Sequence, residues 1–182
     1  MAFCAGTGPA LRVMAEWKYP EIEPFAILYA PYYRLTDHMA WSLTGVIHFS
    51  GRIFGIHPSE ENRVLFDTFV QTYGIDTDDL EEDPTLRQFD LASSPMMWAD
   101  KISDKDIYII HARNDGMVAF TDSLKLRDHL SPNNNVHMLI TDILTHDGFA
   151  PFTLETFFAT YLPAFNRLQD MTESILIQHS PL

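Results

Sequence analysis

The chain has 182 residues, of which 46% are hydrophobic, and a formal net charge of −13. This length and composition suffice for one domain with a sizeable core, and the charge argues against binding nucleic acid or an anionic membrane surface through bulk electrostatics. The single cysteine excludes an internal disulfide, and no apolar run approaches the roughly 18 residues of a membrane span. We therefore expect a soluble, cytoplasmic protein without a secretory leader.

The first part of the chain is typical of a tight turn that leads into a helix. Ala5 and Gly6 are small enough for a strand-to-helix turn to pass close to neighbouring backbone, and Pro9 suits a first helical turn. Helical apolar spacing follows over residues 10–18. Cys4 lies in this turn. A lone cysteine is most often a small buried hydrophobe, and it becomes a nucleophile only where a base stands beside it.

Residues 24–31 form a continuous apolar run between two prolines, which is typical of a buried parallel strand. Tyr32 and Tyr33 follow this run and are expected at the carboxyl edge of the sheet. They either line a substrate pocket or are amphipathic rim residues beside a loop. Roughly 75 residues then pass before the next expected strand, far more than an ordinary crossover connection.

The long segment after this strand contains one clear helix. Residues 60–73 have helical periodicity, with acids at the start and a glycine after the end. Residues 76–83 form a loop in which six of eight residues are Asp or Glu, and a solvated face explains it better than calcium binding because no ligand spacing appears. His38, His48 and His57 also lack the spacing of metal ligands, so we expect them at polar surface or satisfied core positions.

Two strands and two polar turns dominate the second half. Residues 107–112 and 136–140 are predicted strands, and an amphipathic helix is expected at 121–130 between them. Asp115 lies in the Asn-Asp-Gly turn after the first strand, and His146 lies in the turn after the second. Because the carboxyl ends of parallel strands share one edge, these two side chains can meet there, where a carboxylate holds an imidazole in one tautomer.

The last expected element is an amphipathic helix over residues 151–168. Its charge order, with Glu155 early and Arg167 late, agrees with the helix dipole. Pro163 is expected to kink this helix or to end its first half. Residues 169–182 are expected to continue as a tail without assigned structure.

The order of these motifs resembles the α/β-hydrolase family. ARNDGMV at residues 112–118 and LTHDGF at 144–149 resemble the acid and histidine loops that follow its last two core strands. SPMMWADKI at 94–102 is similar to the lead-in of dienelactone-hydrolase-like and prolyl-oligopeptidase-like members. The resemblance covers the chain as the C-terminal part of that fold. It implies an α/β fold with a parallel sheet of the α/β-hydrolase type, the N-terminal strands missing, and a helical cap insertion.

By the same resemblance, AFCAG at residues 2–6 stands where the family's nucleophile elbow has G-x-S-x-G. Cysteine replaces serine, as in dienelactone hydrolases, and alanine replaces the first glycine. The implied triad is Cys4 as nucleophile, His146 as base and Asp115 as the acid that orients it, with the N–H of Ala5 in the oxyanion hole. An alternative alignment puts Gly6 at the nucleophile position and makes the chain catalytically dead.

The resemblance also divides the chain into three parts. An elbow, helix and core strand occupy residues 1–35, a cap or lid occupies 36–100, and a C-terminal core with the acid and histidine loops occupies 101–182. Because the strands that precede the elbow in the family are missing, we expect either a truncated sequence that lacks its N-terminal half or a half-fold that associates, for example as a homo-oligomer, through its open sheet edge. Little activity is then expected from this chain alone.

The predicted function is hydrolysis of an ester, thioester or lactone bond in a small acyl substrate, through an acyl-enzyme on Cys4 and without need of a metal or cofactor. Two alternatives stay open. One is a non-catalytic binding or scaffold module that keeps the pocket and the cap, and the other is an acyltransferase or polyester synthase that uses the same thiol. Covalent labelling that is lost in Cys4→Ala or His146→Ala separates an enzyme from a scaffold.

Overall fold

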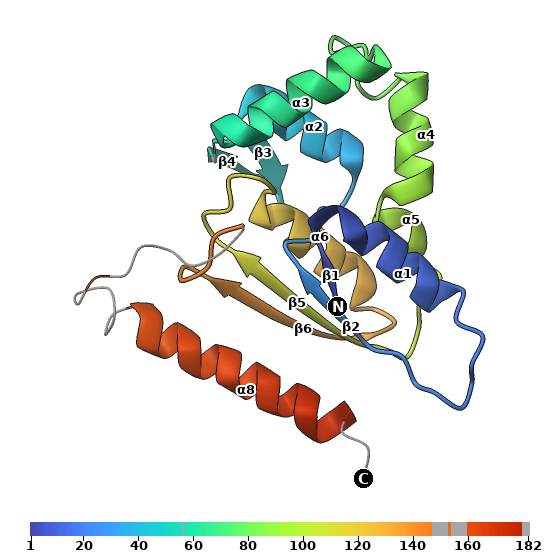
Figure 1. Cartoon of the computed structure of the whole chain (residues 1–182), viewed down its shortest axis with the longest axis vertical. Coiled ribbons are helices and arrows are strands. Elements are labelled where there is room, and N and C mark those ends of the chain that lie inside the picture. Colours follow the sequence, from blue (N-terminus) through green and yellow to red (C-terminus); the bar gives the residue numbers. More distant parts are fainter. Residues whose placement is uncertain (56, 147–152, 154–159, 180–182) are drawn as a thin grey trace.

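A four-stranded parallel sheet forms the centre of the molecule (Figure 1). The computed structural model describes residues 1–55, 57–146, 153 and 160–179. The strand order is β1-β2-β5-β6, and the strands span Ala2–Phe3, Ala26–Tyr29, Asp106–Ala112 and Asn135–Thr141. Each neighbouring pair is parallel. The carboxyl ends of all four strands therefore lie at one edge of the sheet, as expected.

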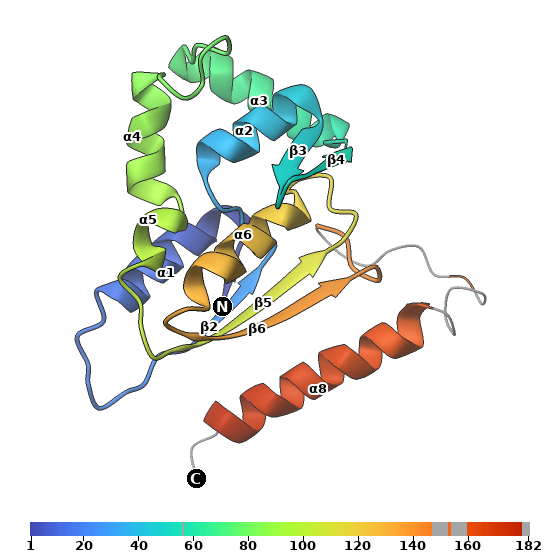
Figure 2. The same cartoon turned by 180° about the vertical axis from the view of Figure 1, so that it is seen from behind.

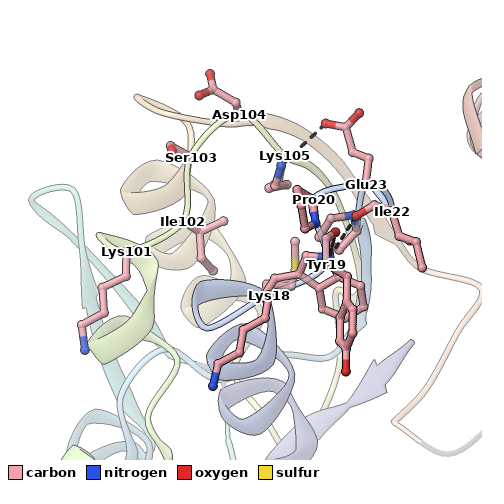
Figure 3. A pocket seen from close by; sticks show the side chains of 13 residues that line it. Lys18, Tyr19, Pro20, Ile22, Glu23, Lys101, Ile102, Ser103, Asp104 and Lys105 are labelled. Atoms are coloured by element: carbon pink, nitrogen blue, oxygen red, sulfur yellow. Dashed lines mark hydrogen bonds and ion pairs between the residues drawn. The ribbon is translucent and has the colours of Figure 1, made fainter.

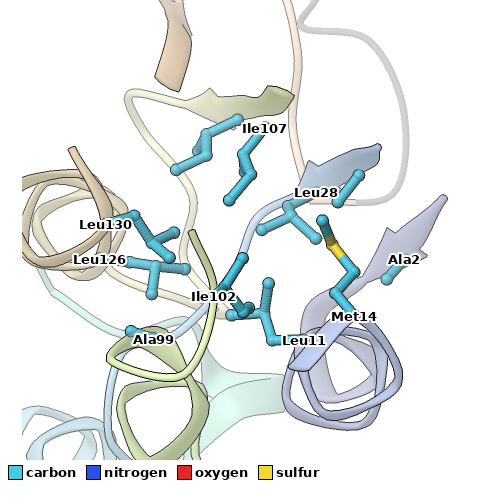
Figure 4. Close-up of a cluster of buried hydrophobic side chains, with 11 residues drawn as sticks. Ala2, Leu11, Met14, Leu28, Ala99, Ile102, Ile107, Leu126 and Leu130 are labelled. Carbon is cyan, nitrogen blue, oxygen red and sulfur yellow. The ribbon is translucent and has the colours of Figure 1, made fainter. Parts of the chain in front are cut away.

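One face of the sheet carries the main hydrophobic core. Helices α1 (Thr7–Ala15), α5 (Met96–Ala99) and α6 (Phe120–Leu130) cover this face. Figure 4 shows how side chains from these helices meet those of the strands, and the cluster includes Leu11, Leu28, Ile102, Ile107, Leu126 and Leu130. Burial of this apolar surface is the main force that holds the helices on the sheet.

Helix α8 (Leu162–His179) lies on the opposite side of the sheet from α1 and α6, as Figure 2 also shows. Tyr108 points to this side because side chains alternate along a strand, and its hydroxyl donates to Gln178 Oε1 at 2.5 Å. The imidazole of His179 stacks on Phe25 with ring centroids 3.9 Å apart. None of the helices within the described residues is long and apolar enough to span a membrane.

A large inserted segment separates β2 from β5 and stands over the carboxyl edge of the sheet (Figure 1). It contains helices and one antiparallel hairpin, namely α2 (Leu35–Thr44), β3 (Val46–Phe49), β4 (Arg52–Gly55), α3 (Glu60–Tyr73), α4 (Pro84–Ser93) and α5. Its own core joins α2, α3 and α4 through Met39, Phe66, Ile75 and Leu86. The inserted segment thus packs around a hydrophobic centre separate from that of the sheet.

Local signals define the helices of the inserted segment. The Ser59 hydroxyl accepts from Asn62 N at 3.1 Å and caps α3, and Gly74 ends this helix with a φ of +66°. Asp83 caps α4 by accepting from Leu86 N at 2.7 Å. Asp83, the last residue of the acidic loop, is therefore a buried structural residue and does not belong to the solvated face expected for this loop.

Most of the predicted elements are confirmed, and the C-terminal prediction is wrong in part. The strands expected at 107–112 and 136–140 and the helix expected at 60–73 are present. The start of the helix predicted over 151–168 lies largely outside the described residues. Its end does not match, because α8 continues to His179 through part of the expected tail. Pro163 lies in the first turn of α8, which directly follows two residues, 160 and 161, with π-helical backbone.

Candidate active site

Cys4 stands at the turn between β1 and α1, in a short 3-10 helix at Cys4–Gly6. Its φ is +42°, in the left-handed region that residues other than glycine rarely adopt and that costs of order 1–3 kcal/mol. Gly6 has an ordinary φ of −72° and precedes α1 directly. Of the two alignments considered above, the one centred on Cys4 matches the position of the sharp turn.

The start of α1, just after the turn at Cys4, packs closely against the end of α4 in the inserted segment. A Cβ added to Gly8, near the start of α1, would lie 1.6 Å from the carbonyl oxygen of Ser93 at the end of α4. Only glycine fits there without a shift of the backbone. The Tyr32 hydroxyl donates to the same Ser93 carbonyl at 2.8 Å. The elbow, the end of β2 and the inserted segment therefore meet at one point.

Asp115 and His146 are paired at the carboxyl edge of the sheet. His146 Nδ1 lies 2.9 Å from Asp115 Oδ2, although the two residues follow different strands. Asp115 is 1% exposed, and its Oδ1 accepts from the backbone N–H groups of Met117 at 2.8 Å and Val118 at 2.9 Å. Burial alone would raise the pKa of this carboxyl, but the hydrogen bond from His146, the nearby His111 and the Val118 N–H together bring it below its usual value.

His146 links Asp115 to Cys4. Its hydrogen bond to Asp115 and, second, its interaction with the nearby Cys4 side chain raise the pKa of His146 to about 10, against the opposing effect of burial. Since Nδ1 is directed at Asp115, Nε2 is the ring nitrogen left for the thiol. The three predicted triad residues, which come from three separate parts of the sequence, are thus brought together.

A cavity of about 370 Å³ opens beside Cys4 and Ala5. The inserted segment supplies most of its walls, which are largely apolar, with residues that include Leu35, Met39, Leu65, Phe66, Phe69 and Phe89. Tyr32 also lines the cavity, as expected of a pocket residue. Tyr33 lies apart from the cavity, because its hydroxyl pairs with His129 Nδ1 on α6 at 3.1 Å and its ring packs against the sheet core.

Comparison with other proteins finds structures of similar fold but no protein family or curated protein of similar sequence. No protein-family model matches the sequence, and no curated protein matches it. Among solved structures, Pyrococcus horikoshii acylaminoacyl peptidase is similar with a TM-score of 0.56 and 14% identity, over 95% of this chain and 22% of that chain. The Pyrococcus furiosus esterase Pf2001 is similar with a TM-score of 0.50 and 18% identity, over 97% of this chain and 51% of that chain.

The chain has an α/β-hydrolase fold. It spans 22% and 51% of the lengths of these two proteins of similar structure. Within this fold, the strand-to-helix turn at Cys4 and the two polar turns after β5 and β6 share the carboxyl edge of the sheet. Among the described residues, no group of three His, Cys, Asp or Glu side chains is placed to hold a metal ion.

Two polar residues that no sequence pattern singled out also line the cavity, namely His38 on α2 and Asn62 on α3. His38 was expected at the polar surface or at a satisfied core position, and this expectation is wrong, because its Nδ1 is buried without a partner in the described part of the chain. Burial lowers the pKa of His38 to about 4. His57 is exposed, and the side chain of His48 lies outside the described part. No local pattern marks His38, since the elements around it come from distant segments.

A second hollow, of about 590 Å³, lies at the opposite edge of the sheet, next to the amino ends of β2 and β5. Figure 3 shows its side chains, including Lys18, Lys101 and Lys105. Lys105 Nζ lies 3.6 Å from Glu23 Oε1 across this hollow. Because the triad residues all stand at the carboxyl edge, this hollow is not part of the candidate active site.

Proposed function

We propose that this protein hydrolyses ester, thioester or lactone bonds of a small acyl substrate with a Cys4–His146–Asp115 triad. The observation that carries the proposal is that His146 is hydrogen-bonded to the buried carboxylate of Asp115 and lies close enough to the Cys4 side chain for the two to interact. Cys4 has left-handed backbone at a strand-to-helix turn, and this supports the same role because such a turn directs the side chain outward from the carboxyl edge of the sheet.

In the first step, Cys4 attacks the substrate carbonyl. The thiolate is the nucleophilic form of a cysteine, and the raised pKa of His146 keeps its ring protonated at neutral pH, so that it can give a proton to the leaving group. The thiolate sulfur bonds to the carbonyl carbon, and the carbonyl oxygen becomes an oxyanion. Collapse breaks the bond to the leaving group, which takes the Nε2 proton of His146. The products of this step are an acyl-thioester on Cys4 and a free alcohol or thiol.

In the second step, water hydrolyses the acyl-enzyme. His146 is now neutral and takes a proton from a water molecule as the water oxygen bonds to the thioester carbon. Collapse of this intermediate releases the carboxylic acid and restores the thiolate beside the imidazolium. Asp115 keeps the ring in one orientation through both steps.

The backbone N–H of Ala5 is proposed to stabilise the oxyanion. Ala5 is in the first turn of the helical segment that starts at Cys4, where N–H groups have no acceptor within the helix, and it lines the cavity. A donor placed at the developing negative charge is worth about 10²–10³-fold in rate in comparable acyl-transfer sites.

The inserted segment is proposed to act as a cap over the acyl group, within the division at residues 1–35, 36–100 and 101–182. Two hydrogen bonds hold it to the acid loop, since Asn62 Nδ2 donates to Met117 O at 2.7 Å and Ser59 N donates to Gly116 O at 2.8 Å. The apolar walls that it supplies suit the hydrocarbon part of an acyl chain.

Mass spectrometry of the intact chain after mixing with p-nitrophenyl butyrate or a butyryl thioester tests the proposal. We expect a mass increase of one butyryl group on Cys4 that decays as butyrate is released. Cys4→Ala should abolish the adduct and His146→Gln should slow its formation strongly, whereas His57→Gln, an exposed site in the inserted segment, should have no effect.

The products decide between the alternatives. If the acyl group leaves Cys4 only when an alcohol or amine acceptor is added, the protein is an acyltransferase that shares the first step. If Cys4 forms no adduct and iodoacetamide labels it equally in wild type and His146→Gln, the triad is inactive and the protein is a binding module.

A further inference from the structure

A histidine on β5 is buried beside the acid loop that carries Asp115. His111 has no exposed surface, and the alternation of side chains along the strand puts it on the same face of the sheet as the core residues Ile107 and Ile109. Buried polar side chains are normally hydrogen-bonded, and here both ring nitrogens have partners. The imidazole of His111 is therefore held in one orientation.

The partners of the two ring nitrogens fix the protonation state of His111. Nε2 lies 3.0 Å from the carbonyl oxygen of Val118, which can only accept, so Nε2 carries a proton. Nδ1 lies 2.5 Å from Ser123 Oγ on α6. Because burial lowers the pKa of His111 to about 4, the ring is neutral at physiological pH and Nδ1 has a free lone pair. The Ser123 hydroxyl therefore donates to Nδ1, and the ring is the Nε2–H tautomer.

This tautomer connects His111 with Asp115 through Val118. The Val118 carbonyl accepts from His111 Nε2, and the Val118 N–H donates to Asp115 Oδ1 at 2.9 Å. His111 Nε2 also lies 3.5 Å from Asp115 Oδ2, the oxygen that is 2.9 Å from His146 Nδ1. His111 thus holds the residue that binds one oxygen of the carboxylate, and it places an N–H group close to the other oxygen.

The charge of Asp115 depends on these neighbours, because a carboxylate that is 1% exposed has little contact with water. His111 and His146 both favour its charged form, against the opposing effect of burial. His38 on α2 also interacts electrostatically with Asp115, but burial, which lowers the pKa of His38 to about 4, keeps this ring neutral. Of these three histidines, only His146 has a raised pKa, so the carboxylate is paired with the one imidazolium that faces Cys4.

We propose that His111 is a positioning residue of the triad, which holds the acid loop through Val118 so that Asp115 Oδ2 stays turned toward His146. This inference rests on the proposed function, because the orientation of His146 affects catalysis only if Cys4 is the nucleophile. His111 has no exposed surface and is not among the described residues that line the cavity, so it does not touch a substrate. Its loss should therefore lower kcat and leave KM nearly unchanged.

His111→Phe tests the role, because it removes both hydrogen bonds and fills the same space with a ring. We expect kcat for p-nitrophenyl butyrate to fall on the order of 10- to 100-fold, the effect of a small misplacement of a catalytic group. The pKa of His146, followed by NMR, should fall by about one unit or more, because its carboxylate partner is no longer held in place. His111→Gln keeps a donor that reaches Val118 O and should recover most of both losses.

His137→Phe is the matched control. His137 is on the neighbouring strand β6, and its ring stacks on Tyr108 with centroids 4.7 Å apart, on the face of the sheet opposite to His111. A phenyl ring can keep this stacking, so neither kcat nor the pKa of His146 should change. The control shows whether replacement of any histidine in the sheet by phenylalanine disturbs the triad.

A purely structural role of His111 gives a different result. If His111→Phe is folded and both its kcat and its His146 pKa equal those of wild type, the inference is overturned. If His111→Phe does not fold, Ser123→Ala takes its place, because it frees Nδ1 of His111 and leaves the ring present. A fall of kcat and of the His146 pKa in Ser123→Ala then supports the inference, and no change in either overturns it.

The NMR titration needs no turnover and so separates this inference from the proposed function. If wild type forms no acyl-enzyme but His111→Phe still lowers the pKa of His146, the control of Asp115 by His111 stands and the hydrolase proposal fails. If esters are hydrolysed but neither kcat nor the pKa of His146 responds to His111→Phe, the hydrolase proposal stands and the positioning role fails.

Discussion

Asp115→Asn is the substitution that tests the triad most directly. The amide oxygen of asparagine can still accept from Met117 N and Val118 N, which lie 2.8 and 2.9 Å from Asp115 Oδ1. The amide NH₂ then replaces Oδ2 and faces His146 Nδ1, now 2.9 Å from the carboxylate. The amide N–H of asparagine and the Nδ1–H of His146 would then point at each other, so the neutral imidazole carries its proton on Nε2. In that tautomer the ring is not correctly protonated to serve Cys4 in both steps.

The magnitude follows from the pKa of His146. The interaction with Asp115 contributes most to the rise of the His146 pKa from 6.5 to about 10, and the interaction with Cys4 contributes next. At about 1.4 kcal/mol per pKa unit, this rise corresponds to about 5 kcal/mol of interaction with the imidazolium, and Asp115 supplies the larger part. Loss of that part should bring the pKa of His146 toward 6.5 and lower kcat by roughly 10²–10⁴-fold.

The assay is the pH dependence of p-nitrophenyl ester hydrolysis, with the His146 ring titrated in parallel by NMR. In Asp115→Asn the alkaline limb of the rate profile should move to lower pH, because the imidazolium is lost earlier. Asp142→Asn is the matched control, since Asp142 follows the same strand as His146 but forms an exposed pair with Arg113 at 3.0 Å. If kcat of Asp115→Asn stays within threefold of wild type and the alkaline limb does not move, the role assigned to Asp115 is wrong.

The remaining predictions concern the nucleophile, the helix contact and a buried acid. Cys4→Ser should lower the rate of acyl-enzyme formation by about 10²-fold or more, because serine lacks a readily formed anion, and burst kinetics would measure this; an unchanged burst argues against attack by Cys4. Gly8→Ala should destabilise the fold by about 2–4 kcal/mol in urea unfolding, since its Cβ would collide with Ser93 O, whereas Gly55→Ala, which meets open space, should change stability little; equal effects would contradict the close contact. Burial raises the pKa of Asp122 to about 7, so its ionisation favours the unfolded chain and stability falls as pH rises from about 4 to 7. Asp122→Asn should therefore be more stable than wild type at pH 8, by up to about 4 kcal/mol, and similar at pH 4 in urea unfolding, and an equal difference at both pH values would refute this.

Patterns within single segments predicted most of the regular structure. The strands at 107–112 and 136–140 are β-branched apolar runs with turn residues on both sides, and the helix at 60–73 has a serine cap before it and a left-handed glycine after it. These signals act over a few residues, so the sequence carries them without reference to the rest of the fold. The pairing of Asp115 with His146 was also predictable, because parallel strands bring their carboxyl ends to one edge.

Elements that depend on distant partners were predicted less well. α8 extends to His179 because that ring stacks on Phe25 and Gln178 accepts from Tyr108, contacts that join residues more than 60 positions apart. α1 begins at Thr7, two residues before Pro9, because the turn at Cys4 passes directly into the helix.

The sequence by itself indicated the parallel α/β arrangement, the two polar turns and the tight turn near residues 4–6, since periodicity, turn chemistry and small residues are local properties of the chain. Only the tertiary structure decided that the Cys4 side chain meets His146, that Tyr33 packs away from the cavity and that His38 lines it. Each of these outcomes depends on which distant segments pack against the residue. The burial that leaves His38 neutral, with its Nδ1 unpaired among the described residues, arises only when α2, α3 and the acid loop come together.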